Sequence, residues 1–338
     1  MAGPLRTVGQ PLIDAPLKAY HAWHEFWFQP QNPLALSLMR LFVGGMLFYT
    51  HFIWGLEFDA FFSNKDSWQS QEFVLALQKD QWAWSFWWWI PEVWKHTAHH
   101  ICLTILAAFW LGFATRITGW AAFLITISYA QRVPLATYGL DQVNGFCVLY
   151  LAIAPSGAKL SIDAWLRRVC EASRHCRRLR FFFPAPTPSP TARVATRLLQ
   201  LHLCVMYLFA GLGKLQGETW WNGEALWLSA GNLEYQSNDL TWIAHYPWFY
   251  QLMSVGTWVW ELTFSLLIWR PRLRSTMIAA GIGMHLGIGM FMGMWTFGLS
   301  MIFVYCAFIN PDWLSIHIAN IPFVSRHRGD VLAGSASG

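Results

Sequence analysis

The sequence has little charge for its length. Of its 338 residues, only 12% are Asp, Glu, Lys or Arg, whereas 55% are hydrophobic. A soluble domain carries about a quarter of its residues as charged ones, so this composition argues against an ordinary soluble enzyme. The apolar residues also come in long runs, which are typical of helices that face lipid. The sequence therefore predicts an integral membrane protein.

Cysteines and clusters of metal ligands are also scarce. The chain has six cysteines, namely Cys102, Cys147, Cys170, Cys176, Cys204 and Cys306. Four lie in apolar runs and two in a basic loop, so we expect no disulfides. Cys170, His175 and Cys176 are close in sequence, but they have no fourth ligand nearby, which favours a solvated loop over a metal site. No metal cofactor is predicted.

A cleavable signal peptide is not visible at the N-terminus. Residues 1–33 form a mixed segment, and the stretch 18–28 places aromatic residues among polar ones, at Tyr20, Trp23, Phe26 and Trp27. This pattern predicts an amphipathic helix that lies along the inner membrane surface. The first apolar run then serves as an uncleaved anchor.

The apolar runs predict an all-α fold, a polytopic bundle of about eight transmembrane helices with additional interfacial helices. The expected spans are 34–56, 98–115, 117–133, 143–155, 194–215, 250–269, 275–294 and 296–310. The fourth and eighth are short, and the third is interrupted near Arg132. We expect one transmembrane domain, 34–315, made of two four-helix halves, and a tail at 316–338.

Basic residues are distributed unevenly between the two sets of loops. With the N-terminus inside, the inner loops hold Arg6, Arg116, the cluster 159–197, Arg270 and Arg326 among others, and the outer loops hold most of the acids. Outside fall only Lys65, Lys79, Lys95 and Arg132. The positive-inside rule therefore predicts that both termini are cytoplasmic.

The inner loop 156–193 joins the two halves. It is rich in arginine and ends in the Pro-rich stretch PAPTPSP. We expect its basic part to rest on anionic headgroups and its Pro-rich part to act as a linker. A nucleic-acid patch is the weaker alternative, because topology already explains inner-loop arginines, and no nucleic-acid partner is predicted.

Four ionisable residues stand out within the predicted spans: Arg40, Lys214, Glu261 and His285. Such groups are costly in hydrocarbon and usually face the bundle interior with a partner. Glu261 and His285 lie near the midplane on consecutive antiparallel helices, which predicts a hydrogen bond between them. This bond is either a structural clamp or part of a catalytic site.

Small residues surround His285 at helical spacing. Gly281, Gly289 and Gly293 share its face, and Gly283 with Gly287 forms a second pair. Both sets predict close helix packing.

Two of the ionisable residues allow two interpretations each. Arg40 either snorkels to the cytoplasmic surface or meets an internal carboxylate. Lys214 either snorkels outward or, desolvated beside Tyr207, acts as a base. Spacing alone favours snorkelling for Lys214.

The outer connection 131–142 is bracketed by Arg132 and Asp141. Together with Lys214 and the pair Trp220–Trp221, these residues could form one polar pocket at the outer leaflet. The dense tryptophans of the outer loops are typical of an interfacial belt, and they could also line a site for a flat or isoprenoid ligand.

Four stretches resemble the HTTM (horizontally transferred transmembrane) domain. They are NPLALSLMRLFVGG, RVPLATYGLDQ…APSGAKLSIDAW, RLLQLHLCVMYLFAGLGKLQGETWWNGEALW and GTWVWELTFSLLIW…GMHLGIGMFMGMWTFGLSMI. The resemblance covers about residues 30–315, and the block around Lys214 is its most specific part. This domain is shared by many bacterial membrane proteins and by the vitamin K-dependent gamma-carboxylases. It implies a bacterial cytoplasmic membrane and a quinone or hydroquinone, similar to vitamin K, as cofactor.

The resemblance also implies a role for Lys214. In the carboxylases, the lysine of the matching motif is the proposed base that deprotonates vitamin K hydroquinone, and the oxygenated quinone then takes a proton from a glutamate side chain, to which carbon dioxide adds. This chain ends soon after its last span, without the large lumenal domain of the carboxylases. Tyr138 and Asp141 stand in the region where the carboxylases have an important histidine. These differences argue against carboxylation of a peptide glutamate and leave the quinone-type chemistry.

We therefore expect a membrane-embedded, lyase-like enzyme that acts on a quinol or another lipophilic small molecule, or on a peptide. The expected catalytic residues are Lys214, His285 and Glu261. The expected pocket residues are Arg40, Arg132, Tyr138, Asp141, Tyr207, Trp220 and Trp221. The alternative is a non-catalytic scaffold, an immunity-type protein or a lipid-handling protein. A transporter is weaker, because neither paired broken helices nor internal repeats are visible.

Overall fold

The computed structural model describes residues 10–64, 67–80, 82–173, 176, 178–234 and 237–319. These residues form the all-α fold that the sequence predicts, and no strand occurs among them beyond one isolated bridge between Gln31 and Ser189. Several expectations fall outside the described residues. They concern Arg6, Lys65, His175 and the tail from residue 320, with Arg326. All six cysteines are free thiols.

A helix occupies each of the eight expected spans. These helices are α2 (Leu34–Leu56), α5 (Lys95–Leu111), α6 (Thr115–Arg132), α7 (Gly139–Ile153), α9 (Pro190–Lys214), α12 (Pro247–Leu267), α13 (Pro271–Met292) and α14 (Trp295–Val304). Of these, α2, α9 and α13 are each long and apolar enough to cross a membrane. A fourth candidate is the bent pair Trp295–Phe308 and Pro311–His317, with 104° between its parts. These lengths and compositions are compatible with an integral membrane protein.

Shorter helices fill the connections. The α-helices are α1 (Gln10–Phe28), α3 (Phe58–Phe62), α4 (Gln71–Leu77), α8 (Ile162–Ala172), α10 (Glu218–Trp221), α11 (Ala225–Ala230) and α15 (Pro311–Ala319). The 3₁₀ turns are η1 (Phe86–Trp88), η2 (Glu92–Trp94), η3 (Pro134–Ala136), η4 (Leu179–Phe182), η5 (Thr241–His245) and η6 (Tyr305–Phe308).

Proline and glycine set several of the long-helix ends. Pro190, Pro247 and Pro271 stand in the first turn of α9, α12 and α13, where the missing N–H costs no helical hydrogen bond. Gly112 (φ +76°) and Gly293 (φ +69°) end α5 and α13 in the left-handed conformation, which glycine adopts without a Cβ clash. These local signals explain why the sequence predicts the helices well.

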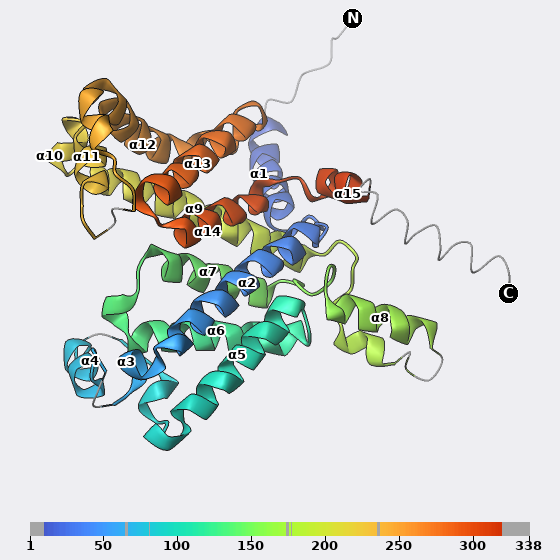
Figure 1. The fold of residues 1–338 in the computed structure, drawn as a ribbon. Coiled ribbons are helices and arrows are strands. Elements are labelled where there is room, and N and C mark those ends of the chain that lie inside the picture. The colour runs from blue at the N-terminus through green and yellow to red at the C-terminus, as the bar shows by residue number, and fades with distance from the viewer. Residues whose placement is uncertain are drawn as a thin grey trace, which may run out of the picture.

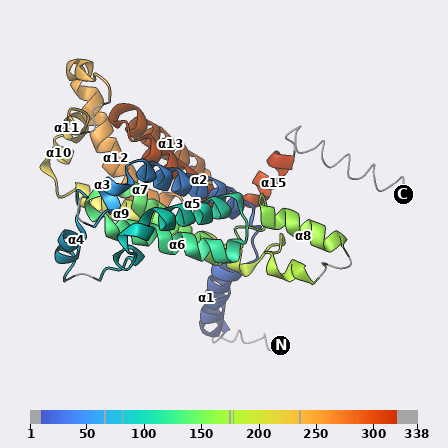
Figure 2. The same ribbon diagram turned by 60° about the horizontal axis from the view of Figure 1, so that its bottom comes forward.

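In the bundle, α2 packs against α5 and α7, α9 packs against α12, and α14 from the end of the chain packs against both α2 and α7. Figure 1 shows α12 and α13 on one side of α2 and α14, with α5 and α6 on the other. The short helices α3, α4, α10 and α11 gather at one end of the bundle, whereas α8 and α15 lie at the opposite end (Figures 1 and 2). The long helices therefore run between two distinct ends.

Candidate functional site

The contact between α9 and α12 depends on a glycine. Tyr207, Gly211 and Lys214 recur at helical spacing and so share one face of α9. A Cβ on Gly211 would lie only 2.9 Å from two side-chain carbons of Leu262 and 3.1 Å from its backbone nitrogen. The absence of this Cβ lets α12 approach closely enough for side chains on either side of Gly211 to meet α12.

Lys214 forms an ion pair with Glu261 at this contact. The Lys214 Nζ atom lies 2.8 Å from both carboxylate oxygens and donates a hydrogen bond to Oε1. The Lys214 side chain is 19% exposed and the Glu261 side chain 8%. Lys214 therefore does not simply snorkel outward, since its charge is held between two helices.

One tryptophan lies beside the ion pair, and its sequence neighbour packs against α12. The Lys214 Nζ atom lies 5.1 Å from the centre of the Trp220 ring, a cation–π distance. Trp221 donates from Nε1 to the Leu215 carbonyl at 2.8 Å and contacts Trp258, with 5.2 Å between ring centres. The structure thus brings together three predicted site residues, Lys214, Glu261 and Trp220, and Trp221 follows Trp220 in the same short helix α10.

A second cluster of polar residues surrounds Tyr207, which lies two turns of α9 before Lys214. The hydroxyl of Tyr207 lies 2.8 Å from His285 Nε2 and 2.6 Å from the Tyr305 hydroxyl. All three residues are buried, and His285 Nδ1 has no hydrogen-bond partner among the described residues. Tyr305 lies inside the expected span 296–310. It was not predicted as a site residue, because a tyrosine in an apolar span is typical of ordinary packing as well as of a site.

The predicted hydrogen bond between Glu261 and His285 is therefore wrong. Glu261 bonds to Lys214, and His285 bonds to Tyr207, both residues of α9. Residue counting placed both groups at the same depth, but it did not give the rotation of each helix about its own axis. Tyr207 also packs against Trp260, with 4.8 Å between ring centres.

The glycines around His285 differ in their surroundings. A Cβ on Gly281 would lie 2.7 Å from the Trp260 ring, and one on Gly289 would lie 2.8 Å from the Trp295 ring, so these two confirm the predicted close packing. A Cβ on Gly283 would have no neighbouring side chain or helix within 4 Å, and a Cβ on Gly287 would meet only the Phe291 ring of its own helix, at 3.8 Å. Close packing at this second pair was a wrong prediction, because both residues face away from the neighbouring helices.

Arg40 does not snorkel, and it forms no ion pair with a carboxylate among the described residues, although Asp163 lies near enough to act on it electrostatically. The side chain is fully buried and donates to backbone carbonyls, from Nε to Ser156 at 3.2 Å and from Nη1 to Phe109 at 3.0 Å and to Trp110. Phe109 and Trp110 belong to the last turn of α5, whose carbonyls carry partial negative charge. The Phe109 carbonyl also accepts a hydrogen bond from the Gly112 N–H at 3.0 Å. Arg40 therefore joins α2 to the end of α5 and does not reach the Lys214–Glu261 pair.

The predicted outer pocket is not assembled as one site. Arg132 is fully buried and donates to the carbonyls of Gln69 and Ser63, both at 2.7 Å. Asp141 accepts from the Tyr138 backbone N–H at 3.0 Å and caps α7. Among the described residues, neither Arg132 nor Asp141 contacts the Lys214–Glu261 pair, because each is used to hold its own connection in place.

A histidine cluster in the first half was missed. His99 Nδ1 lies 2.7 Å from the Tyr129 hydroxyl, and the His51 ring lies edge-on to the Tyr129 ring with 4.5 Å between centres. His51 and His99 are both buried. Their position within apolar helices was the signal that could have found them.

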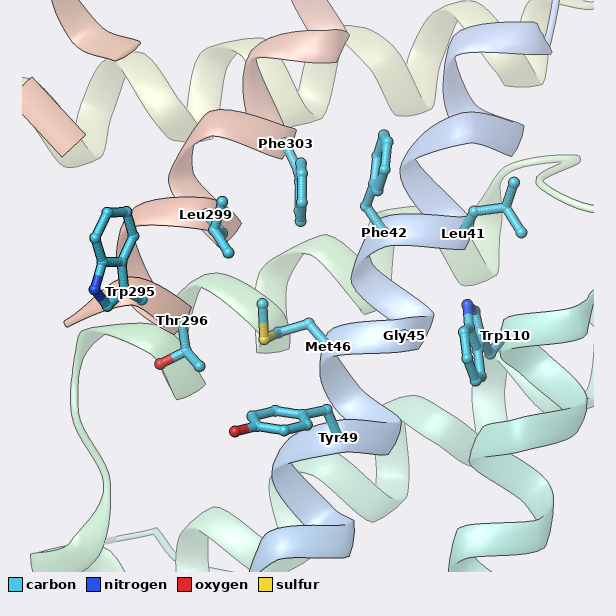
Figure 3. Close-up of a pocket in the computed structure, with 10 residues that line it drawn as sticks. All are labelled: Leu41, Phe42, Gly45, Met46, Tyr49, Trp110, Trp295, Thr296, Leu299 and Phe303. Carbon is cyan, nitrogen blue, oxygen red and sulfur yellow. The ribbon is translucent and has the colours of Figure 1, made fainter. Parts of the chain in front are cut away.

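An apolar groove lies between α2, α5 and α14 (Figure 3). Its volume is about 670 Å³, and its lining is Leu41, Phe42, Gly45, Met46, Tyr49, Trp110, Trp295, Thr296, Leu299 and Phe303. Phe42 and Phe303 stack with 4.1 Å between ring centres. Tyr138 reaches the groove lining, since its hydroxyl lies 3.1 Å from Thr296 Oγ1.

Comparisons with protein-family models, with curated proteins and with solved structures find no match to this chain.

Proposed function

We propose that the chain is an HTTM-type integral membrane protein that crosses a bacterial cytoplasmic membrane eight times, with both termini in the cytoplasm. Support comes from the helix in each expected span and from the charge asymmetry of the loops. The grouping of α3, α4, α10 and α11 at one end of the bundle agrees with this topology, because all four belong to expected outer connections. In this orientation Lys214 lies toward the outer leaflet.

We further propose that the Lys214–Glu261 pair accepts the hydroxyl proton of a lipophilic substrate, such as a quinol, at the outer leaflet. The observation that carries this proposal is the pair itself, 2.8 Å apart and still 19% exposed on the lysine side. A buried ion pair often stabilises a protein no better than apolar residues of similar volume. Its presence between two apolar helices therefore favours a chemical role.

The ion pair changes the division of roles expected for a lysine base. In this proposal Lys214, which is paired with a carboxylate, acts as an ammonium group and not as the base. We propose that the quinol O–H bond breaks, that its proton passes to the Glu261 carboxylate, and that the Lys214 ammonium stabilises the quinolate oxygen. The flat ring of such a substrate matches the faces of Trp220 and Trp221.

The test uses the protein reconstituted in vesicles with an isoprenoid naphthohydroquinone as probe. We expect wild-type protein to accelerate loss of hydroquinone absorbance in air, and Lys214→Met and Glu261→Gln to lower the rate by about 100-fold or more, the range typical of a lost acid–base group. Lys79→Met, in an outer connection, is the matched control and should behave as wild type. Full activity in either pair variant would contradict the proposal.

Lipid handling without catalysis is a second candidate, and the apolar groove favours it. A volume of about 670 Å³ falls in the range of small-ligand pockets, and the aromatic lining suits one hydrocarbon chain of a lipid. Leu299→Trp should fill the groove and reduce co-purification of lipid in native mass spectrometry. Leu286→Trp, on the outward face of α13, is the control. Unchanged lipid retention in Leu299→Trp would count against this candidate.

A further inference from the structure

A polar pocket of about 360 Å³ lies at the end of α9 remote from Lys214. Since α9 has 25 residues, a rise of 1.5 Å per residue puts its two ends roughly 36 Å apart. The pocket forms where the α1–α2 connection, the start of α9, the start of α13 and the segment 307–312 meet. It is therefore a separate site from the proposed proton-accepting pair.

Three arginines line this pocket: Arg193 and Arg197 from α9, and Arg274 from α13. We call it the arginine pocket. No carboxylate within the described residues forms an ion pair with any of the three. Their guanidinium charges converge without an anionic partner.

The arginines are held by neutral acceptors. Arg193 and Arg197 both donate from Nε to the Phe26 carbonyl, at 3.1 and 3.2 Å. Arg197 also donates to Gln200 Oε1 at 2.8 Å, and Arg274 donates to the Ile268 carbonyl at 3.3 Å. These bonds fix the positions of the guanidinium groups but leave their charge uncompensated.

Aromatic rings hold Arg197 in place. Its guanidinium carbon lies 4.1 Å from the centre of the Phe26 ring and 5.5 Å from that of Trp269. Such stacking orders the side chain before any ligand arrives, which lowers the entropy cost of binding.

One acidic residue, Asp312, also lines the pocket. Its carboxylate accepts from Asn32 Nδ2 at 3.4 Å, and Asn32 Oδ1 in turn accepts from Lys159 Nζ at 2.9 Å. Burial lowers the pKa of the Lys159 ammonium, and the nearby Asp312 carboxylate partly offsets this by raising it. The pocket therefore keeps a net positive charge, because three guanidinium groups line it with one carboxylate, which also interacts electrostatically with Lys159.

We propose that the arginine pocket binds a phosphate-type anion, held by Arg193, Arg197 and Arg274. Guanidinium groups bind phosphate oxygens through paired, charge-assisted hydrogen bonds. The positive-inside rule accounts for arginines at this end of the molecule but does not require three of them to enter one pocket. Arg270 and Arg272 illustrate the difference, because both are exposed and neither lines the pocket.

The anion has two possible sources, an anionic lipid headgroup or free phosphate. Basic pockets between helices at the cytoplasmic surface are suited to anionic headgroups. The experiment separates the two sources with phosphatidylglycerol, phosphatidylcholine of the same chain length, and inorganic phosphate. Binding to the purified full chain in neutral detergent is followed by native mass spectrometry for the lipids and by isothermal titration calorimetry for phosphate.

We expect wild-type protein to retain one phosphatidylglycerol in preference to phosphatidylcholine. The double variant R197Q/R274Q should bind about tenfold more weakly or worse, the typical effect of losing hydrogen bonds to a charged group. The matched control R270Q/R272Q removes the same charge from the same end of α13 and should bind as wild type. Saturation by inorganic phosphate alone, with equal loss in R197Q/R274Q, would support the phosphate site with free phosphate as its source.

Equal weakening in both double variants would overturn the proposal, because it would show a diffuse basic surface. Unchanged binding in R197Q/R274Q would overturn it as well. If that variant does not fold, R274Q alone leaves the α9 contacts intact and should still weaken binding relative to R272Q. None of these results depends on the quinol chemistry.

Discussion

The buried cations of this molecule meet two kinds of partner. Arg40 and Arg132 are surrounded by backbone carbonyls, which are neutral and unable to take up a proton at ordinary pH. Lys214 instead meets a carboxylate. At the scale of single residues, Arg40 and Arg132 therefore hold segments of the chain together. Of the three cations, only Lys214 has a partner that can gain a proton, the Glu261 carboxylate.

Removing one member of the Lys214–Glu261 pair should destabilise the protein, because it leaves the other member without its partner. We expect Glu261→Gln to lower the free energy of unfolding by about 1–3 kcal/mol, less than for a fully buried pair because Lys214 is partly exposed. The double variant Lys214→Met/Glu261→Leu should recover most of this loss, since no unpaired charge remains. Thermal unfolding in detergent measures both, with exposed Glu218→Gln as control, and equal stability of all four proteins would contradict the expectation.

Tyr207 should matter through its hydroxyl. Tyr207→Phe removes the contacts to His285 and Tyr305 and leaves their buried polar atoms without a partner. We expect a loss of about 1–3 kcal/mol in unfolding free energy. Tyr246→Phe, at an exposed position, should change little. A Tyr207→Phe protein as stable as wild type would show that this hydrogen-bond network contributes nothing to the fold.

At the scale of elements, the packing of α9 on α12 depends on which glycine faces the neighbour. Gly211 meets Leu262, whereas Gly213 has no other atom within 4 Å of its Cβ position. Both glycines stand in the same helix and look equivalent in the sequence GLGK. Only the rotation of α9 in the bundle distinguishes them.

Alanine at these two positions should therefore have opposite effects. We expect Gly211→Ala to destabilise the protein by about 1–3 kcal/mol through overpacking and to reduce hydroquinone turnover, because the helices separate beneath the ion pair. Gly213→Ala should be neutral or stabilise by up to about 1 kcal/mol, since alanine favours helix. Thermal unfolding of the two variants side by side gives the comparison, and equal effects would refute the assigned rotation of α9.

At the scale of the whole molecule, the proposed topology predicts which loops a membrane-impermeant thiol reagent reaches. An introduced Asn222→Cys should be labelled in intact cells, because Asn222 is exposed and lies in an expected outer connection. The native Cys176 of the inner loop should be labelled only after the membrane is permeabilised. The reverse labelling pattern would invert the orientation and place the arginine pocket outside.

The sequence by itself determined the helices of this protein and the residues that need partners. Apolar runs act over a few residues, so the positions of α2, α5, α9 and α13 follow from local signals, although the observed ends of the last three differ from the expected ones by up to four residues. The cost of charge in hydrocarbon likewise singled out Lys214, Glu261 and His285 without any contact being known.

Only the tertiary structure decided which of these groups meet. Successive residues of an α-helix point about 100° apart. The sequence does not determine how a helix is rotated about its axis, and a small change in that rotation gives a side chain a different partner on the neighbouring helix. In the observed rotation, Glu261 bonds to Lys214 and His285 bonds to Tyr207. The fold of the chain also places the start of α13 beside the start of α9. Arg274 therefore lines the same pocket as Arg193 and Arg197, although it is far from them in sequence.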